Sequence, residues 1–390
     1  MTPIEPSLAD LLGPWRLGEP LDCAGVPRHI LRSVGTAGGL SLWLAGPHGD
    51  VRVDVYPLEA TGADRPQRAA AHTTLLGLSY RGLDTMPPAL GKRLCEAVAV
   101  RIGQHESTVI SALQRHHGDT RIRSVRGGPL LTRMGHGFEA FYGLDPYIGC
   151  LIGCRFCYAQ GRAQAWRRLL GLRDARWGSW VDVREDAPAV LAAELDTLPP
   201  LPIKLSPLVT DPYQAIERQR RITRQCLEVL VARPAPPPVI VLTRSEVVLD
   251  DLALLRALPE VWVGMSIPGL DDAVRQRLEP GAATIQQRLE TLATLRDAGV
   301  RTFVVIQPVL PGDPQRLAAA VAAVVNSATV DTLHGSYGAA SEFAVGDLAD
   351  AAAPDWQRQQ HAAVVAALEA NGVDVWRGEL PIQLGTESPA

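Results

Sequence analysis

The sequence predicts an α/β fold, a partial (β/α)6 barrel of the TIM type with a small N-terminal α+β domain. Two observations lead to this fold class. Six short apolar runs, typical of strands buried on both faces of a sheet, recur along the last two thirds of the chain. Longer segments with helical periodicity separate these runs, and parallel strands need such crossover helices.

The predicted barrel strands share a core of consecutive apolar residues. They are 138–143, 202–207, 238–243, 260–267, 301–309 and 329–335. The predicted helices are 214–232, 249–258, 284–299, 314–325 and 356–371, and 373–378 is a candidate extra strand. In barrels of this type, active sites gather at the carboxyl ends of the strands.

The N-terminal part predicts a separate domain of mixed structure. Residues 40–45 and 51–58 predict two strands joined by the five-residue turn 46–50, and 74–80 predicts a third strand. A helical pattern follows Pro87. We expect four parts: an N-terminal domain 1–105, a connector 106–137, the barrel 138–345 and a C-terminal helix and strand extension 346–390.

Composition places the chain among folded globular proteins. Hydrophobic residues make up 46%, charged residues 21%, and the net charge is −4, which gives no overall attraction to nucleic acid. No apolar run approaches the roughly 20 residues of a membrane span, and the N-terminus has no secretory pattern. We therefore expect a cytoplasmic protein, in which clustered cysteines indicate metal binding or catalysis more than disulfides.

Three cysteines lie within eight residues of one another: Cys150, Cys154 and Cys157, spaced C-x3-C-x2-C. Cysteine thiolates hold iron–sulfur clusters, and a [4Fe–4S] cluster with three protein ligands keeps one iron open. A structural zinc site would need a fourth ligand, but His136 lies fourteen residues upstream of Cys150. The spacing therefore predicts a [4Fe–4S] cluster with an open coordination position.

The motif has an aromatic residue on each side of its last cysteine, Phe156 and Tyr158, and it resembles that of the radical S-adenosylmethionine (SAM) superfamily. The segment PYIGCLIGCRFCYAQ is similar to the spore photoproduct lyase-related group of this superfamily. Later segments share that similarity, which covers roughly residues 138–315: 209–230, 242–245, 265–267, 278–300 and 307–313.

The resemblance implies two cofactors, the [4Fe–4S] cluster and SAM. In that superfamily the open iron binds SAM, and reduction of the cluster yields methionine and a 5′-deoxyadenosyl radical that abstracts hydrogen from a substrate. It also implies an electron donor of the flavodoxin or ferredoxin type.

The resemblance further implies roles for residues at matching positions. The cluster ligands are Cys150, Cys154 and Cys157. The residues expected to bind cofactor are Tyr158, Ser206, Thr210, Asp211, Arg244, Ser266 and Gln307. Among these, Arg244 and Ser266 match the residues that hold the SAM carboxylate and ribose. Tyr158 and Tyr213 are candidate catalytic residues, as hydrogen donors.

The chain departs from spore photoproduct lyase at the position of that enzyme's hydrogen-donor cysteine, where Leu208 stands. The leading hypothesis is therefore a radical SAM enzyme acting on a small-molecule or peptide substrate. A second hypothesis is DNA repair with a hydrogen donor other than cysteine, so DNA is a partner that is not favoured. A third is an iron–sulfur protein that senses redox state or scaffolds a complex without catalysis.

Overall fold

The structure is a computed structural model of the chain. It describes residues 20–21, 29–35, 40–57, 76–104, 121–126, 129–135, 137–161, 163, 167, 176–205, 209–344 and 346–381. The chain divides into two compact units. The N-terminal unit consists of residues 1–129, 159–176 and 180–186, and the barrel unit consists of residues 130–158, 177–179 and 187–390.

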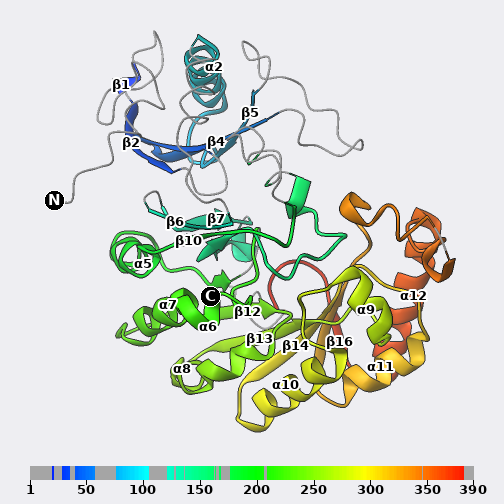
Figure 1. Cartoon of the computed structure of the whole chain (residues 1–390). Helices are drawn as coiled ribbons and strands as arrows, with labels where there is room; N and C mark the ends of the chain where they lie inside the picture. The colour runs from blue at the N-terminus through cyan, green and yellow to red at the C-terminus, as the bar shows by residue number, and fades with distance from the viewer. Residues whose placement is uncertain are drawn as a thin grey trace. The chain divides into compact units, whose positions relative to one another are not determined.

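The N-terminal unit contains an antiparallel sheet with the strand order β1-β2-β3-β4-β5 (Figure 1). Its strands are β1 (Pro20–Leu21), β2 (His29–Gly35), β3 (Leu40–Gly46), β4 (Gly49–Pro57) and β5 (Leu76–Arg81), and its helix is α2 (Pro88–Gln104). The three predicted strands and the helix are present. Gly46 pairs with Gly49, so the turn between β3 and β4 has two residues and not five. Tyr80 of β5 ties the sheet to α2 by donating a hydrogen bond to the Cys95 carbonyl at 2.8 Å.

The N-terminal unit also includes a pair of parallel strands that are distant in sequence, β6 (Ile122–Val125) and β10 (Val181–Arg184). Arg123 donates to both oxygens of Asp182, at 2.8 and 2.6 Å. This unit therefore extends beyond the predicted boundary at residue 105, and it includes chain from after the three cysteines. The predicted connector contributes β6 to it.

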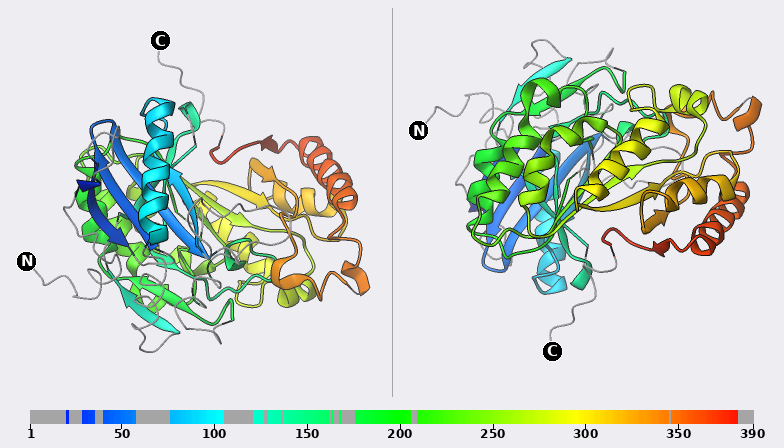
Figure 2. Two further views of the ribbon diagram at one scale, coloured as in Figure 1. Left: turned by 90° about the horizontal axis from the view of Figure 1, so that it is seen from above. Right: turned by 90° about the horizontal axis from the view of Figure 1, so that it is seen from below.

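The barrel unit is built on one sheet with the strand order β16-β15-β14-β13-β12-β11-β8-β7. Figure 2 shows the helices of this unit, coloured from green to red along the chain, in two further views. The strands are β7 (Leu131–Met134), β8 (Phe141–Leu144), β11 (Ile203–Leu205), β12 (Val239–Thr243), β13 (Val261–Ser266), β14 (Arg301–Ile306), β15 (Ser327–Val330) and β16 (Asp374–Trp376). From β8 to β16 all neighbours are parallel, and only β7 pairs antiparallel, with β8. This confirms the predicted α/β fold with a partial barrel, including the extra strand at its end.

The helices of the barrel unit connect these strands. They are α5 (Ala187–Leu195), α6 (Glu217–Arg220), α7 (Ile222–Val231), α8 (Leu252–Ala257), α9 (Asp272–Leu278), α10 (Ile285–Asp297), α11 (Pro314–Ala322) and α12 (Pro354–Ala370), with short 3-10 turns at η3 (Glu246–Asp251), η4 (Tyr337–Ala339) and η5 (Gly346–Leu348). The predicted helix 214–232 is divided, because Arg221 adopts a left-handed conformation between α6 and α7. In the part of the chain that the structure describes, no helix has the length and apolar character to cross a membrane.

The two faces of the barrel sheet carry different cores. Side chains such as Val304 and Ile306 pack with α10, α11 and α12 in one cluster. The alternate residues of the strands pack in a second cluster on the opposite, inner face, which contains Phe141, Ile240, Trp262, Phe303 and Trp376. Because successive side chains of a strand point to opposite faces, this division determines which residues can line the barrel interior.

Candidate functional site

Three of the predicted cofactor-binding residues continue the inner face of neighbouring strands. Arg244, Ser266 and Gln307 lie at the carboxyl ends of β12, β13 and β14. Each follows an inner-face residue of its strand by four positions, and those residues are Ile240, Trp262 and Phe303. The two-residue period therefore predicts that all three side chains lie on the inner face, at one end of the barrel.

The three cysteines lie on the loop that follows the short strand β9 (Tyr147–Ile148), which comes after β8 in the chain. Cys150 and Cys154 are 7% and 6% exposed and pack with Ile152 and Phe156, whereas Cys157 is half-buried. The five cysteines that the structure describes are all free of disulfides. Gly153 makes the loop's tight path possible, since it has a φ of +67° and an added Cβ would lie 2.9 Å from the Cα of Gly178.

A buried amide holds the cysteine loop on both sides of Cys150. Gln214 is fully buried and donates from Nε2 to the Gly149 carbonyl at 3.1 Å, while its Oε1 accepts from the Leu151 amide at 2.7 Å. Thr210 adds a hydrogen bond from its hydroxyl to the same Gly149 carbonyl, at 2.8 Å. Sequence reasoning missed Gln214, although it lies within the quoted segment 209–230.

The segment between α9 and α10 holds the other part of the loop. The Arg155 amide donates to the Leu278 carbonyl at 2.7 Å, and the Gly281 amide donates to the Ile152 carbonyl at 2.9 Å. A Cβ at position 281 would lie only 2.5 Å from the Leu151 carbonyl oxygen. Glycine at position 281 is therefore required for this close approach.

Asp211 connects the loop after β11 to the end of β12. Its Oδ1 accepts from the Thr243 hydroxyl at 2.6 Å and from the Tyr213 amide at 2.9 Å, and its Oδ2 accepts from the Arg244 amide at 2.8 Å. Burial raises the pKa of this carboxyl, although the hydrogen bonds act in the opposite direction. These hydrogen bonds of Thr210 and Asp211 are to the protein itself, and their expected role in binding SAM stays a prediction.

Arg244 belongs to a buried ionic group. Its Nε donates to Oε1 of Glu279 at 2.5 Å, and Nη1 of Arg288 lies 3.0 Å from Oε2 of the same carboxylate. Burial by itself would raise the pKa of Glu279, but Arg288 and Arg244 outweigh it and hold this pKa below its ordinary value. The Arg244 guanidinium also lies 6.0 Å from the centre of the Phe156 ring. Phe156 directly precedes Cys157 in the sequence.

The polar atoms of Ser266 and Gln307 differ in their hydrogen bonding to the rest of the protein. Ser266 is 1% exposed, and its hydroxyl has no hydrogen-bond partner among the described residues. Gln307 donates from Nε2 to Oδ2 of Asp331 at 2.9 Å, and His334 lies 2.9 Å from the same oxygen. Sequence reasoning missed Asp331 and His334, which follow β15 and so lie at the same end of the sheet.

The two tyrosines proposed as hydrogen donors have different surroundings. Tyr158 directly follows the last cysteine and is 46% exposed. Tyr213 is fully buried and donates from its hydroxyl to Asp251 at 3.1 Å. Ser206 and Leu208 lie outside the described residues.

The cysteine loop fits the expected iron–sulfur cluster. Burial raises the pKa of Cys150 to about 12, and nearby charges including Cys157 act in the same direction. Burial likewise raises the pKa of Cys154, with Cys157 and Cys150 adding to the shift and Arg244 opposing it. Iron bound to the three cysteines would offset the charge of their thiolates.

A single metal ion fits the loop less well. Within the described ranges, no three His, Cys, Asp or Glu side chains are arranged to ligate one ion. The cysteines of a [4Fe–4S] cluster bind different iron atoms, so their sulfurs need not converge on one point. The arrangement therefore favours a cluster over a mononuclear site.

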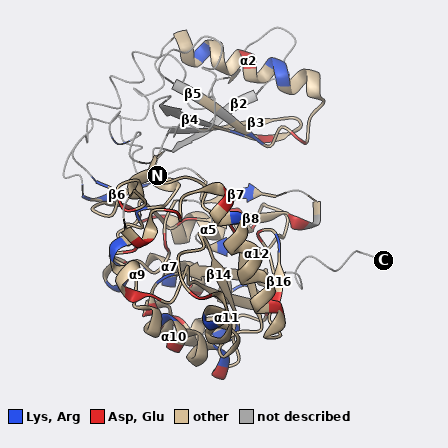
Figure 3. Cartoon of the chain, turned by 90° about the vertical axis from the view of Figure 1, so that its right-hand side faces the viewer, with Lys and Arg blue, Asp and Glu red and all other residues tan. Residues whose placement is uncertain are grey.

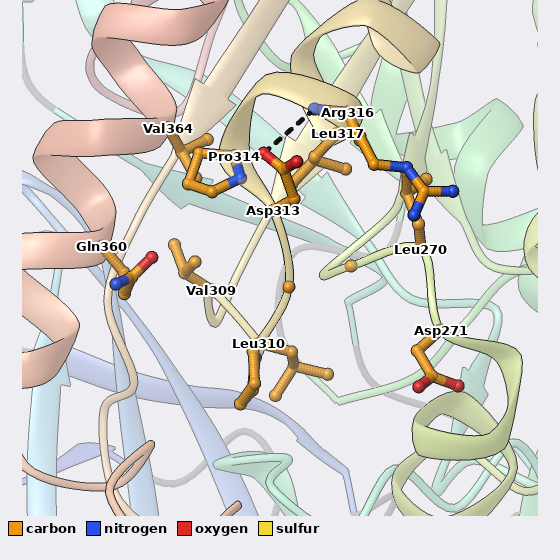
Figure 4. Close-up of a pocket in the computed structure, with 13 residues that line it drawn as sticks. Leu270, Asp271, Val309, Leu310, Asp313, Pro314, Arg316, Leu317, Gln360 and Val364 are labelled. Atoms are coloured by element: carbon orange, nitrogen blue, oxygen red, sulfur yellow. Dashed lines mark hydrogen bonds between the residues drawn. The ribbon is translucent and has the colours of Figure 1, made fainter. Parts of the chain in front are cut away.

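A separate pocket of about 330 Å³ lies among the loops that follow β13 and β14 and the helix α12 (Figure 4). Its polar lining includes Asp271, Asp313 and Arg316, and its apolar lining includes Val309 and Val364. Each aspartate accepts backbone hydrogen bonds at the start of the helix that follows it. None of the cysteines, and none of the predicted cofactor-binding residues, lines this pocket.

Residues 144–321, which contain the cysteine loop and the strands β11 to β14, match the family model described as the Radical SAM superfamily. This part of the chain is a radical SAM domain. The superfamily uses a [4Fe–4S] cluster and SAM, in agreement with the two predicted cofactors. The domain begins at the end of β8 and ends within α11.

Two relatives of known sequence are similar to part of the chain. An uncharacterized protein of Methanocaldococcus jannaschii is 29% identical over 175 residues, which cover 44% of this chain and 61% of that protein. The radical SAM Nalpha-GlyT isomerase of Pseudomonas phage M6 is 27% identical over 169 residues, which cover 43% of this chain and 33% of the isomerase. The chain thus spans one third to three fifths of the length of these two relatives.

Among solved structures, spore photoproduct lyase complexed with dinucleoside spore photoproduct is similar to this chain with a TM-score of 0.44. The sequences are 14% identical, and the similarity covers 60% of this chain and 75% of the lyase.

Proposed function

We propose that the chain is a radical SAM enzyme that abstracts hydrogen from a small-molecule or peptide substrate. The observation that carries the proposal is the cysteine loop, which is anchored within the radical SAM domain by Gln214 and Gly281. When bound, the cluster and SAM supply a 5′-deoxyadenosyl radical. The protein's own contribution is to hold these groups and to position the substrate beside them.

The proposed roles follow from the position of each side chain. Cys150, Cys154 and Cys157 hold the cluster. Arg244 binds the SAM carboxylate, since a guanidinium matches a carboxylate with two parallel hydrogen bonds. The Ser266 hydroxyl, which makes no hydrogen bond within the described part of the chain, is available to the ribose. Gln307 lies beyond it, on the next strand.

Production of 5′-deoxyadenosine tests the proposal. The full chain is reconstituted anaerobically with iron and sulfide, reduced with dithionite and given SAM. We expect 5′-deoxyadenosine from the reconstituted protein and none from the Cys150→Ala, Cys154→Ala or Cys157→Ala variants, which should also lose the broad absorbance near ~400 nm. A protein that holds its cluster but forms no 5′-deoxyadenosine would instead support the redox-sensing or scaffolding hypothesis.

The DNA-repair alternative has less support. Leu208 replaces the donor cysteine, and the Tyr213 hydroxyl is bound to Asp251. In Figure 3 basic and acidic residues are interspersed along the helices of the barrel unit, whereas DNA binding favours a continuous basic surface. We expect no thymine to be restored in an oligonucleotide that contains the spore photoproduct.

A further inference from the structure

Two buried side chains and one partly buried side chain next to the cysteine loop form one ionic group, which we name the triad: Glu279, Arg288 and Arg244. The Glu279 carboxylate lies between the two guanidinium groups, 2.5 Å from Nε of Arg244 and 3.0 Å from Nη1 of Arg288. Two cations and one anion leave the triad with one net positive charge. A charge of this kind acts over a longer distance inside a protein than in water, because less solvent screens it.

The triad is held rigidly. The side chains of Glu279 and Arg288 are 1% and 0% exposed, and that of Arg244 is 20% exposed. Arg288 also donates from Nη1 to the Ser266 carbonyl at 2.8 Å and from Nε to the Ala283 carbonyl at 3.0 Å. Its position is therefore determined by three groups, and Glu279 in turn orients Arg244.

Backbone hydrogen bonds place the triad beside Cys154. The Leu278 carbonyl, directly before Glu279, accepts from the Arg155 amide, which directly follows Cys154. The Gly281 amide, two residues after Glu279, donates to the Ile152 carbonyl, two residues before Cys154. The two chain segments are thus joined on both sides of Glu279 and of Cys154. The Arg244 guanidinium lies 6.0 Å from the centre of the ring of Phe156, which stands between Cys154 and Cys157 in the sequence.

We propose that the net positive charge of the triad raises the reduction potential of the cluster held by Cys154, with Glu279 and Arg288 as positioning residues for Arg244. One-electron reduction by a low-potential donor adds a negative charge to the cluster, and a nearby cation stabilises the more negative state. Net charge around a cluster is one of the factors that set its potential. This inference rests on the cluster of the proposed function, but it does not depend on SAM cleavage.

A redox titration of the reconstituted full chain tests the proposal, with the reduced cluster measured by electron paramagnetic resonance in the absence of SAM. Arg244→Gln removes the net charge, so we expect a more negative potential. Arg244→Lys keeps the charge, so we expect a potential near that of the unaltered protein. Glu279→Gln leaves two cations, so we expect a less negative potential.

The double variant with Arg244→Gln and Glu279→Gln separates charge from structural damage. It restores one net positive charge through Arg288, so we expect its potential to return toward that of the unaltered protein. Iron and sulfide content and the cluster absorbance, measured for each variant, confirm that the cluster is intact. If one single variant fails to hold a cluster, the other single variant still decides, because a potential equal to that of the unaltered protein would overturn the proposal.

Equal potentials in Arg244→Gln, Glu279→Gln and the unaltered protein would overturn the proposal. So would a double variant whose potential differs from that of the unaltered protein by more than the potential of either single variant does. These results are distinct from a failure of the proposed function. That failure would show as a missing 5′-deoxyadenosine product, while the order of the potentials would still be measurable.

Discussion

At the scale of single residues, the cysteine loop depends on a neutral side chain that carries no obvious chemical signal. Gln214 satisfies the Gly149 carbonyl and the Leu151 amide, which flank Cys150. Both backbone groups lie in a buried region, where an unsatisfied polar group costs roughly 1–3 kcal/mol. Cys150, a proposed cluster ligand, is therefore positioned by an amide that is itself remote in sequence.

Replacing Gln214 should weaken both the fold and the cluster site. We expect Gln214→Ala to lower the free energy of unfolding by about 2 kcal/mol, because the Leu151 amide loses its partner and the Gly149 carbonyl keeps only the hydrogen bond from Thr210. Denaturant unfolding measures this change, and iron content after anaerobic gel filtration measures retention of the cluster. Gln276→Ala, at an exposed position of α9, is the matched control and should change neither quantity. Equal behaviour of the two variants would show that the loop is held without Gln214.

The charge of Glu279 should make stability depend on pH. Arg288 and Arg244 hold its pKa below the ordinary value in spite of burial. When the pKa of a carboxyl is lower in the folded state, the ionised carboxylate stabilises the fold at every pH above the pKa of the unfolded chain. This stabilisation is lost as the pH falls through the pKa that Glu279 has in the folded protein. The Glu279→Gln variant lacks this group.

We therefore expect Glu279→Gln to be less stable than the unaltered protein by ~3 kcal/mol at neutral pH, the scale for breaking a buried ion pair. The difference should shrink between about pH 5 and pH 3, where carboxylates take up protons. Urea unfolding of the cluster-free proteins at a series of pH values measures it. A difference that stays constant over this range would contradict an ionised Glu279 in the folded state.

At the scale of structural elements, the cysteine loop and the segment between α9 and α10 act as one packed unit. Two backbone hydrogen bonds join them, and the α-carbon of Gly281 lies against the Leu151 carbonyl and Ile152. A β-carbon at Gly281 would lie 2.5 Å from the Leu151 oxygen and 2.8 Å from the Ile152 α-carbon. Both are backbone atoms, which do not move aside as a flexible side chain would.

Gly281→Ala should thus displace the cysteine loop. We expect a loss of at least ~1–3 kcal/mol in stability, the range for overpacking a close contact, together with reduced cluster content. Thermal unfolding and iron analysis measure the two effects. Gly312→Ala is a suitable control, since its added Cβ would meet nothing within 4 Å. Full cluster content in Gly281→Ala would show that the loop tolerates a shift.

At the scale of the whole molecule, the two units do not follow the order of the chain. The barrel unit is interrupted by residues 159–176 and 180–186, which belong to the N-terminal unit. There β10 pairs with β6, and the buried Asp182 binds Arg123. A cut after residue 129 would remove β6 and leave Asp182 without Arg123, whereas a cut at the predicted boundary of 105 would retain both.

Two truncated chains test this organisation. We expect residues 106–390 to resist proteolysis within 159–186 better than residues 130–390, because only the longer chain keeps the β6–β10 pair. Limited proteolysis with mass spectrometry locates the cleavage sites, and the uncut full chain serves as the reference. Equal cleavage of the two truncated chains would mean that β6 does not protect this region.

The sequence by itself determined the strands of the barrel and indicated the three cysteines that we propose as cluster ligands. Apolar runs reveal buried parallel strands, and C-x3-C-x2-C spacing reveals a cluster loop, because both signals are contained within short segments. The same pattern predicted one helix over 214–232. The structure divides it at Arg221, where the buried Glu217 carboxylate accepts from the first amides of α7 at 3.1 and 3.0 Å. The helical spacing of apolar residues does not indicate the contact between Glu217 and the amides of α7.

Only the tertiary structure decided what surrounds the cysteines. Gln214 lies more than sixty residues from Gly149 and Leu151, and Arg244 lies 35 residues from Glu279. In sequence, these are an ordinary amide and an ordinary pair of charged residues. Their roles arise because parallel strands bring their carboxyl ends to one edge, where polar groups lose water and must bind one another. The cysteines indicated the chemistry, and this shared burial determines the environment in which it takes place.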